Sequence, residues 1–392
     1  MDEKQLESKY SSGVYTPLDI QLVRGEGTRV WDSEGKEYID CAGGIGVANV
    51  GHSNPKVAEA LAKQASTLTI CPASYYYNDK RAQLLEKLSQ LPPSGLTKAF
   101  LCNSGTEAVE GALKFARAHT GNTEVIAAMR AFHGRTMGSL SATWKRKYRK
   151  PFQPLVPQVN HVPYGNIDKM KEAVSEETAA VLLEPIQGEG GIHLPPENYL
   201  SEVRDLCTAS ETILILDEVQ TGFGRTGHMF ACQHWQVEPD IMCVAKSMGG
   251  GIPIGAIRMK DEIDLHPGIH GSTFGGNPLS SAAALAAITY MEENELPEVA
   301  AETGKYFLTR LKRLSENHPK TVREARGLGL MLALQLREKS GPYLNKLLNR
   351  EVLALPAGSN VIRFLPPLEI SSEDIDQVIN CMNDIFDKGE KN

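Results

Sequence analysis

Between residues 98 and 260 the chain alternates short, uninterrupted apolar runs with stretches of helical periodicity. Runs that are apolar at successive positions, and not at alternate ones, are typical of strands that helices cover on both faces. The alternation of such strands with helices indicates βαβ units, and therefore a three-layer α/β domain with a mostly parallel sheet. The expected strands lie in "KAFLCN", "EVIAAM", "AAVLLEP", "TILILDEV", "DIMCVAK" and "PIGAIRM".

The chain before this region has different patterns. Residues 14–50 contain short strand-like runs, and the turn residues at 32–35 predict a hairpin. Helical periodicity begins near residue 56, and a second helix is expected from about 79 to the two prolines at 92–93. The apolar face of the first helix is expected to comprise Val57, Leu61, Ala65 and Leu68.

After residue 278 the pattern changes again. An Ala-rich helix and a charged helix precede strand-like runs in "EARGLGLMLALQL" and "NVIRFLP", and a terminal helix follows. This order is typical of an α+β unit. We therefore predict an N-terminal segment at 1–50 that joins a smaller domain, a large domain at 51–278 and a small C-terminal domain at 279–392.

Charge and composition argue against several other kinds of protein. The net charge of −7 disfavours general nucleic-acid binding. The N-terminus lacks an apolar signal segment, and no stretch approaches the roughly 20 apolar residues that a membrane span needs. The seven cysteines are scattered and form no CxxC pair, which is typical of reduced thiols. We therefore expect a cytoplasmic protein without a membrane partner.

Polar residues stand where several of the apolar runs end. In an open parallel sheet, ligands bind beyond the carboxyl ends of the strands, so these residues are candidates for a functional site. The candidates are Asn103, Glu184, Asp217 and Lys246, with Glu189 and Gln220 a few positions beyond a strand end.

Each of these positions also has a purely structural explanation. Ser104 and Glu107 in "SGTE" form a capping box, a motif that helices commonly carry without binding anything. Asp217 follows an apolar run and needs a partner, which an ordinary ion pair or a helix cap would supply. The ammonium group of Lys246 can reach water while its stem is buried.

Together, however, these residues supply the parts of one site. A buried lysine amine with a lowered pKa is a nucleophile for carbonyl carbon, and a carboxylate can hold a pyridinium nitrogen. The first N–H groups of a helix bind phosphate, and Gly105 and Thr106 would offer such groups after Ser104. The sequence therefore predicts a pyridoxal phosphate site, in which Lys246 forms the Schiff base and Asp217 keeps the ring nitrogen protonated.

The motifs that contain these residues resemble those of the class III (ornithine-type) aminotransferases of fold-type I, and within them the acetylornithine branch. The resemblance covers nearly the whole chain and implies a three-layer α/β/α large domain with a smaller α+β domain. The motifs that carry it, in the family's order, are "NSGTEAVEGALKFAR", "AFHGRT", "EPIQGEGG", "DEVQTGFGRTG", "AKSMGGGIPIGA", "GSTFGGNPL" and "PAGSNVIRFLPPL".

The resemblance also implies which residues contact the cofactor. Thr273 is implied to reach the phosphate held by a neighbouring subunit, so the family resemblance implies a homodimer with shared active sites. The other implied contacts are Gly105 and Thr106 with the phosphate, Phe132 stacked on the pyridine ring, Val219 beneath it, Asp217 with the ring nitrogen, Gln220 with the phenolic oxygen, and Lys246 as the Schiff-base lysine.

Substrate contacts are implied in the same way. Arg135 matches the arginine that holds a substrate carboxylate, and Ser272 lies where the acetylornithine enzymes contact the same ligand. Arg363 matches the arginine that receives the α-carboxylate of glutamate, and a planar guanidinium binds a carboxylate through two hydrogen bonds. Glu189 is implied to pair with Arg363 while a terminal-amine substrate is bound, and to release it for glutamate.

The implied reaction moves the terminal amino group of N2-acetyl-L-ornithine to 2-oxoglutarate, a step of arginine biosynthesis that gives N-acetylglutamate 5-semialdehyde and glutamate. Ile45 stands where ornithine aminotransferases have a tyrosine, which disfavours free ornithine. Two alternatives stay open. One is a 4-aminobutyrate or other ω-amino acid aminotransferase, and the other is a carrier-protein-linked lysine or ornithine aminotransferase of lysine biosynthesis.

The basic segment "KRKYRK" at 145–150 has two interpretations. It resembles the corresponding segment of aminotransferases that act on substrates carried by an acidic protein, where a basic rim would steer the carrier. Most basic segments, however, are solvated faces without a specific partner.

Other kinds of site have little support in the sequence. No GxGxxG lies between a strand and a helix, and no base-stacking motif accompanies the basic segment. The histidines show no ligand spacing, and the Pro-Gly between His266 and His270 spoils a helical pair, so no metal site is predicted. We expect His52 and His133 to be hydrogen-bonding loop residues.

Overall fold

The computed structural model describes residues 1–263 and 265–389 of the chain. Its large sheet is built from β4 (Lys98–Cys102), β5 (Glu124–Ala128), β6 (Val159–Val162), β7 (Thr178–Leu183), β8 (Ile213–Asp217), β9 (Ile241–Val244) and β10 (Gly255–Met259). The strand order is β4-β10-β9-β8-β7-β5-β6. Neighbours from β9 to β6 are parallel, whereas β10 runs antiparallel to both of its neighbours. The prediction of a mostly parallel α/β sheet is confirmed.

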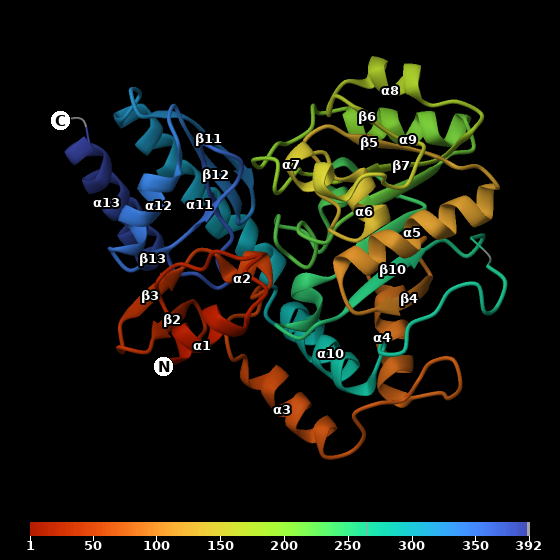
Figure 1. The fold of residues 1–392 in the computed structure, drawn as a ribbon, viewed down its shortest axis with the longest axis horizontal. Helices are drawn as coiled ribbons and strands as arrows, with labels where there is room; N and C mark the ends of the chain where they lie inside the picture. The colour runs from red at the N-terminus through yellow and green to blue at the C-terminus, as the bar shows by residue number, and fades with distance from the viewer. Residues whose placement is uncertain (264, 390–392) are drawn as a thin grey trace.

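Helices cover both faces of this sheet (Figure 1). Side chains from alternate strand positions divide between two apolar clusters: Leu182 and Ile215 pack with helix α5, and Leu214 and Leu216 pack in the cluster that includes residues of α9 and α10. The helices of this region are α4 (Asp79–Gln90), α5 (Gly105–Thr120), α6 (Met137–Ala142), α7 (Arg146–Arg149), α8 (Ile167–Ala173), α9 (Tyr199–Ala209) and α10 (Pro278–Glu293). The three-layer arrangement follows because successive side chains of a strand point to opposite faces.

Two smaller sheets lie beside the large one, where Figure 1 shows the red N-terminal strands next to the blue C-terminal elements. The N-terminal elements are α1 (Glu3–Tyr10), β1 (Leu22–Glu26), β2 (Arg29–Asp32), β3 (Glu37–Asp40), α2 (Gly43–Gly46) and α3 (Pro55–Ala65). The C-terminal elements are α11 (Leu296–Asn317), β11 (Val322–Leu328), β12 (Met331–Leu336), α12 (Gly341–Leu348), β13 (Val352–Leu353), β14 (Leu355–Pro356), β15 (Val361–Phe364) and α13 (Ser372–Gly389).

The predicted N-terminal hairpin is confirmed, because β2 and β3 pair antiparallel around the turn at 32–35. Strand β3 also pairs in parallel with β13, so residues far apart in the sequence share one sheet of order β1-β2-β3-β13. The second small sheet has the order β11-β12-β15-β14. Helix α10 packs against α3 and α4, which precede residue 279 in the chain. The domain boundaries themselves stay predictions.

The expected apolar face of α3 is wrong at its C-terminal end. Val57 is buried and Leu61 is partly buried, but Ala65 is exposed and Leu68 lies beyond the helix with 44% of its surface exposed. Helix α3 ends at Ala65, so Leu68 does not continue its apolar face; Gln64 is buried instead, and its amide donates to the carbonyl oxygen of Leu68.

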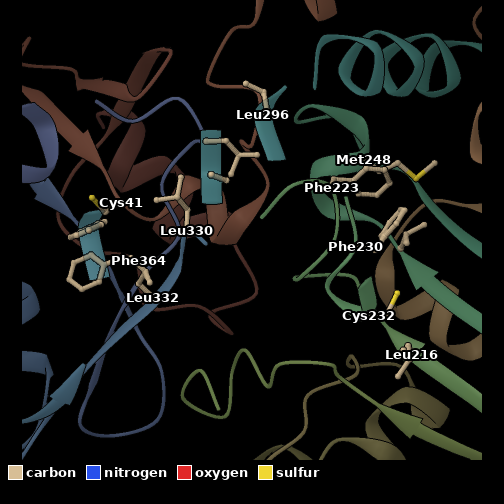
Figure 2. Close-up of a cluster of buried hydrophobic side chains, with 14 of the residues drawn as sticks. Cys41, Leu216, Phe223, Phe230, Cys232, Met248, Leu296, Leu330, Leu332 and Phe364 are labelled. Atoms are coloured by element: carbon tan, nitrogen blue, oxygen red, sulfur yellow. The ribbon is translucent and has the colours of Figure 1, made fainter. Parts of the chain in front are cut away.

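A continuous apolar core joins the large sheet to the C-terminal strands. Figure 2 shows Phe223, Phe230 and Met248 on one side of this core, and Leu330 and Phe364 on the other. The rings of Phe223 and Phe230 meet nearly edge to face, with their centroids 5.3 Å apart. Because these side chains belong to one cluster, the loop after β8 and strand β15 are held in a fixed relation to each other.

Three further observations concern disulfides, membrane-spanning helices and metal sites. The seven cysteines are free thiols. Over residues 1–263 and 265–389, no helix combines the length and the apolar character needed to cross a bilayer. The same described ranges contain no group of three or more His, Cys, Asp or Glu side chains arranged to hold a metal ion.

Candidate active site

The candidate residues at the strand ends meet at one cavity of about 440 Å³. Asn103 follows β4, Glu184 follows β7, Asp217 ends β8, and Lys246 comes two residues after β9. All of these strands point the same way, because β10 reverses direction between β4 and β9. Their carboxyl ends therefore lie along one edge of the sheet, as expected for a ligand site in an open parallel sheet.

The cavity contains most of the residues predicted for the site. Arg363 is not among the lining residues, but it contacts two of them, Glu189 and Gln220. Ser272 and Thr273 line a second cavity, of about 730 Å³, together with Tyr75 and Tyr77. The predicted residues that line the first cavity are Gly105, Thr106, Phe132, Arg135, Glu189, Asp217, Val219, Gln220 and Lys246.

Lys246 has the electrostatic environment of a nucleophilic amine. Burial lowers its pKa, and the nearby carboxylates of Asp217 and Glu189 oppose that shift only in part. Its φ of 47° lies in the left-handed region, which a residue with a side chain adopts only when its surroundings hold it there. Within the described part of the chain, its Nζ forms no hydrogen bond or ion pair. The amine is thus held in the cavity without a competing partner.

Asp217 is held in place by His133. Oδ2 of the buried Asp217 lies 2.7 Å from Nδ1 of His133, and the N–H of Val219 donates to Oδ1 over 3.1 Å. His133 is itself buried, and its backbone N–H donates to the Thr143 hydroxyl. His133 is therefore the hydrogen-bonding loop residue that the sequence predicts, and its partner Asp217 has a fixed orientation.

The N-terminus of α5 opens onto the cavity. The Ser104 hydroxyl accepts from the N–H of Glu107, which confirms Ser104 as the cap. The Glu107 carboxylate accepts from the N–H of Asn103, one residue earlier than in a capping box. The first N–H groups of a helix have no acceptor within it, so those of Gly105 and Thr106 remain available to an anion.

Gly105 also allows close approach between α5 and the loop after β8. A Cβ at position 105 would lie 2.7 Å from Cγ1 of Val219. A Cβ at Gly188 would similarly lie 2.2 Å from Oε1 of Gln220. Glycine at position 105 therefore lets the two cavity walls come together, whereas a side chain at position 188 would displace the end of Gln220.

A cluster of hydroxyl groups joins α5 to the loop that carries Arg135. The Thr106 hydroxyl lies 2.8 Å from that of Thr136 and 2.7 Å from that of Ser139. One turn further along α5, Glu110 accepts from the Thr136 hydroxyl and from the backbone N–H groups of residues 138 and 139. These contacts fix residues 134–136 relative to the helix N-terminus.

Glu184 is a buried carboxyl group beneath the cavity. It accepts from the N–H of Phe132 over 3.1 Å and from that of Gly188 over 3.0 Å. Burial raises its pKa to about 7, a shift that His133 opposes and Asp217 reinforces. One carboxyl group thus holds the backbone of Phe132 and the start of the loop that carries Glu189.

Glu189 and Arg363 form an ion pair in which only Arg363 is fully buried. Nη1 of Arg363 lies 2.6 Å from Oε1 of Glu189 and donates to Oε1 of Gln220 over 3.1 Å. Arg363 is almost fully buried in strand β15, which pairs on both sides, so it is not a surface arginine of an edge strand. The pairing of Glu189 with Arg363 that the resemblance implies is present, and its role as a switch stays a prediction.

Arg135 faces the cavity from a different side. Its guanidinium carbon lies 3.8 Å from the ring centroid of Tyr148 and 5.3 Å from that of Phe132. No ion pair involving Arg135 is found among the residues that the structure describes. Its guanidinium is therefore stacked on aromatic rings and has no carboxylate partner of its own.

These residues fit pyridoxal phosphate. The cofactor aldehyde requires an amine, which Lys246 supplies without another partner, and the pyridinium nitrogen requires a carboxylate, which Asp217 supplies. The phosphate requires hydrogen-bond donors and space, which the first N–H groups of α5 and the absence of a side chain at Gly105 supply. When bound, this cofactor supplies an aldehyde and an electron-withdrawing ring that carry an amino group between two substrates. The fold and the site define a pyridoxal phosphate-dependent enzyme of fold-type I.

Comparison with known proteins specifies the class. The family model "Aminotransferase class-III" matches residues 10–386, and the chain belongs to that family. The acetylornithine aminotransferase of Methanocaldococcus jannaschii is 47% identical over 394 residues, which cover 98% of each chain. The [LysW]-aminoadipate semialdehyde transaminase of Deinococcus radiodurans is 49% identical over 378 residues, which cover 95% of this chain and 87% of that protein.

Solved structures agree with this assignment. The ornithine aminotransferase of Toxoplasma gondii, whose structure has partial occupancy of pyridoxal phosphate at its active site, matches with a TM-score of 0.94 at 32% identity. The match covers 99% of this chain and 95% of that one. The acetylornithine aminotransferase of Elizabethkingia anophelis matches with a TM-score of 0.87 at 34% identity, over 98% of each chain. The protein is a pyridoxal phosphate-dependent aminotransferase.

The sequence did not indicate the partners of His133 and Glu184, and it assigned no role to Glu110. His133 lies in a motif that the sequence does mark, but nothing local to it identifies Asp217 as its partner. Glu184 follows a strand, and its contact with Gly188 is local, but its contact with Phe132 comes from a distant part of the sequence. Glu110 lies one helical turn after Thr106, so its spacing on α5 was the signal that could have found it.

Proposed function

We propose that the enzyme transfers the terminal amino group of N2-acetyl-L-ornithine to 2-oxoglutarate. The observation that carries this proposal is the ion pair between Glu189 and Arg363. While that pair is closed, Arg135 is the guanidinium that faces the cavity without a carboxylate, which suits a donor with one carboxylate remote from its reacting amine. When Glu189 releases Arg363, both guanidinium groups can bind glutamate through its two carboxylates.

Roles for the remaining residues follow from their positions. Lys246 would hold the cofactor and move the substrate proton through its Nζ, an amine whose pKa is lowered by burial. Asp217, oriented by His133, would keep the ring nitrogen protonated. Gly105 and Thr106 would bind the phosphate, while Phe132 and Val219 would contact the ring and Gln220 would bond its phenolic oxygen. Ser272 is proposed as a substrate contact, because its hydroxyl accepts from the amide of Asn103 in the cavity wall over 3.2 Å.

A panel of amino donors tests this proposal. The purified enzyme is assayed with acetylornithine, ornithine, 4-aminobutyrate and carrier-bound lysine, each with 2-oxoglutarate as acceptor. The highest kcat/KM is expected for acetylornithine, and a higher value for 4-aminobutyrate or for carrier-bound lysine would overturn it. Lys246→Ala is expected to abolish turnover and the visible absorbance of the bound cofactor, whereas Lys171→Ala, on an exposed position of α8, is expected to change neither.

A carrier-bound substrate is the second candidate. The relative from Deinococcus radiodurans that is named for a [LysW]-linked substrate is 49% identical to this chain. The basic segment 145–150 reaches the cavity rim through Tyr148, whose ring contacts Arg135. Neutralising Lys145, Arg146 and Lys147 tests docking of an acidic carrier. Loss of activity on the carrier-bound substrate alone would favour this candidate, and equal losses on acetylornithine would exclude it.

We further propose a homodimer in which Thr273 reaches the phosphate in the partner subunit. The exposed aromatic side chains of Tyr75 and Tyr77 support this proposal, since they line the same cavity as Ser272 and Thr273. Light scattering is expected to give twice the 42.8 kDa chain mass. A monomer with full activity would contradict the shared site. A cytoplasmic location stays a prediction from the cysteine pattern.

A further inference from the structure

We propose that Tyr148 is a positioning residue that holds the guanidinium group of Arg135 at the cavity mouth for a substrate carboxylate. This inference rests on the proposed role of Arg135 in substrate binding. Tyr148 belongs to the basic segment "KRKYRK", most of which the proposed chemistry does not use. The inference therefore gives this segment a role in the transfer of amino groups from small substrates, without a carrier protein.

The contact is built from several side chains around one ring. The guanidinium carbon of Arg135 lies 3.8 Å from the centroid of the half-buried Tyr148, which is closer than the Lys147 Nζ at 5.0 Å or the Lys145 Nζ at 5.8 Å. The face of an aromatic ring attracts a cation within about 6 Å of its centroid. Of these cations, Arg135 makes the closest contact, and it is also the one that lines the cavity.

Phe132 connects the Tyr148 ring to the wall of the cavity. Its ring meets that of Tyr148 edge to face, with the centroids 6.2 Å apart and the planes at 85°. The backbone of Phe132 is tied to the buried Glu184 by a hydrogen bond of 3.1 Å. The Tyr148 ring is therefore anchored to the cavity wall through Phe132, and the guanidinium group of Arg135 lies near both rings, closer to that of Tyr148.

Stacking differs from an ion pair in what it leaves available. A carboxylate partner would occupy the N–H donors at the edge of the guanidinium group and compete with the substrate for them. A ring beneath the plane of the group restrains its position but leaves those donors free. This agrees with the absence of any ion pair to Arg135 among the residues described, and with its place on the cavity wall. Tyr148 would thus reduce the conformational freedom that Arg135 must lose when substrate binds.

The test compares acetylornithine with N-acetylputrescine, which is the same donor without its carboxylate. In the holoenzyme, Tyr148→Leu removes the ring and is expected to raise the KM for acetylornithine by about two- to thirty-fold, with little change in kcat. Its kcat/KM for N-acetylputrescine is expected to stay within about twofold of wild type, since that donor offers nothing to Arg135. Tyr148→Phe keeps the ring and should restore the wild-type KM, while Lys171→Ala, on an exposed position of α8, should not change it.

A double-mutant cycle shows whether Tyr148 acts through Arg135. If it does, adding Tyr148→Leu to Arg135→Ala causes no further rise in the KM for acetylornithine. An equal loss for both donors, or full additivity with Arg135→Ala, would overturn the proposal. Tyr148→Met also removes the ring and serves as a second replacement. If Tyr148→Leu alone lowers the melting temperature or the absorbance of the bound cofactor, its effect comes from misfolding, and the KM of Tyr148→Met is used in its place.

Failure of the proposed function gives a different result. In that case the wild-type enzyme itself shows no preference for acetylornithine over N-acetylputrescine, or does not turn over acetylornithine. A wild-type preference that Tyr148→Leu leaves unchanged would instead refute the positioning role alone.

Discussion

Oε1 of Glu189 lies 2.6 Å from Nη1 of Arg363, so a carboxylate of the loop after β7 neutralises a guanidinium group that belongs to the C-terminal sheet. Arg363 is almost fully buried, whereas Glu189 keeps 27% of its side chain exposed. We therefore propose that Glu189, the more exposed partner, is the one that moves when the ion pair opens. This asymmetry is what a site needs if it must bind both a terminal amine and a dicarboxylate.

Replacing Glu189 is therefore expected to change substrate preference. Glu189→Gln removes the negative charge and leaves the Arg363 guanidinium available to carboxylates in every state of the enzyme. We expect the ratio of kcat/KM for glutamate to that for acetylornithine to rise by about tenfold, the equivalent of roughly 1.4 kcal/mol. Steady-state kinetics of both half-reactions measure this ratio. Glu197→Gln, at an exposed position of the following loop, serves as the control, and an unchanged ratio in Glu189→Gln would refute the switch.

Gly105→Ala is expected to weaken cofactor binding. The added Cβ would lie 2.7 Å from Cγ1 of Val219, so the start of α5 must move away from the loop after β8. Such overpacking commonly costs about 1–3 kcal/mol, and we expect the affinity of the apoenzyme for pyridoxal phosphate to fall by about tenfold. Titration by absorbance gives the Kd. Affinity for phosphate-free pyridoxal should fall less, and Gly105→Ala with Val219→Ala should recover the loss; no recovery would place the cause elsewhere.

Glu184 is expected to make stability depend on pH. Its pKa is raised from 4.5 to about 7 by burial, so folding takes up a proton between these values. Below about pH 4.5 Glu184 is protonated in both the folded and the unfolded protein, so its burial does not lower the stability. Above about pH 7 it is ionised in both, and the full free-energy cost of burying its charge then lowers the stability. Stability of the wild type relative to Glu184→Gln should therefore fall by about 3 kcal/mol as the pH rises through this window.

Melting temperatures of both proteins at a series of pH values measure this difference. Glu177→Gln, which replaces an exposed carboxyl group at the other end of β7, serves as the control. A flat difference between wild type and Glu184→Gln would show that Glu184 ionises normally in the folded protein.

Arg225 is expected to hold the C-terminal strands to the loop after β8. Its fully buried guanidinium donates to the carbonyl oxygens of Leu330 and Pro366, over 3.0 and 2.6 Å, and to the side chain of Asn49 over 2.5 Å. Burial lowers its pKa to about 9. Arg225→Met would leave these buried acceptors without a donor, so we expect a loss of about 3 kcal/mol in stability.

The melting temperature of the holoenzyme measures this loss. Arg313→Met, on the exposed face of α11, should leave the melting temperature nearly unchanged. The loop after β8 and the C-terminal strands share the apolar core drawn in Figure 2. If the loss of Arg225 displaces β15, the KM for glutamate should also rise, because β15 carries Arg363. A melting temperature equal to that of wild type would contradict this role of Arg225.

Some parts of the fold exceeded what sequence patterns could predict. Strand β6 is short, and "VNHV" carries polar residues at its centre because it lies at the edge of the sheet. The apolar run of β10 is the same whether the strand is parallel or antiparallel, so its direction could not be read from it. The exposed position of Leu68 follows from the end of α3 at Ala65, before the apolar face can include it.

The sequence by itself determined the strands of the large sheet other than β6, and the polar residues at their ends, among them Asp217 and Lys246. It could do so because an uninterrupted apolar run reports burial on both faces, and the residue that ends it is local to that run. Only the tertiary structure decided that His133 orients Asp217 and that Tyr148 contacts Arg135. Such contacts join segments whose separation is set by loops and by the packing of whole layers, and no local pattern records that distance.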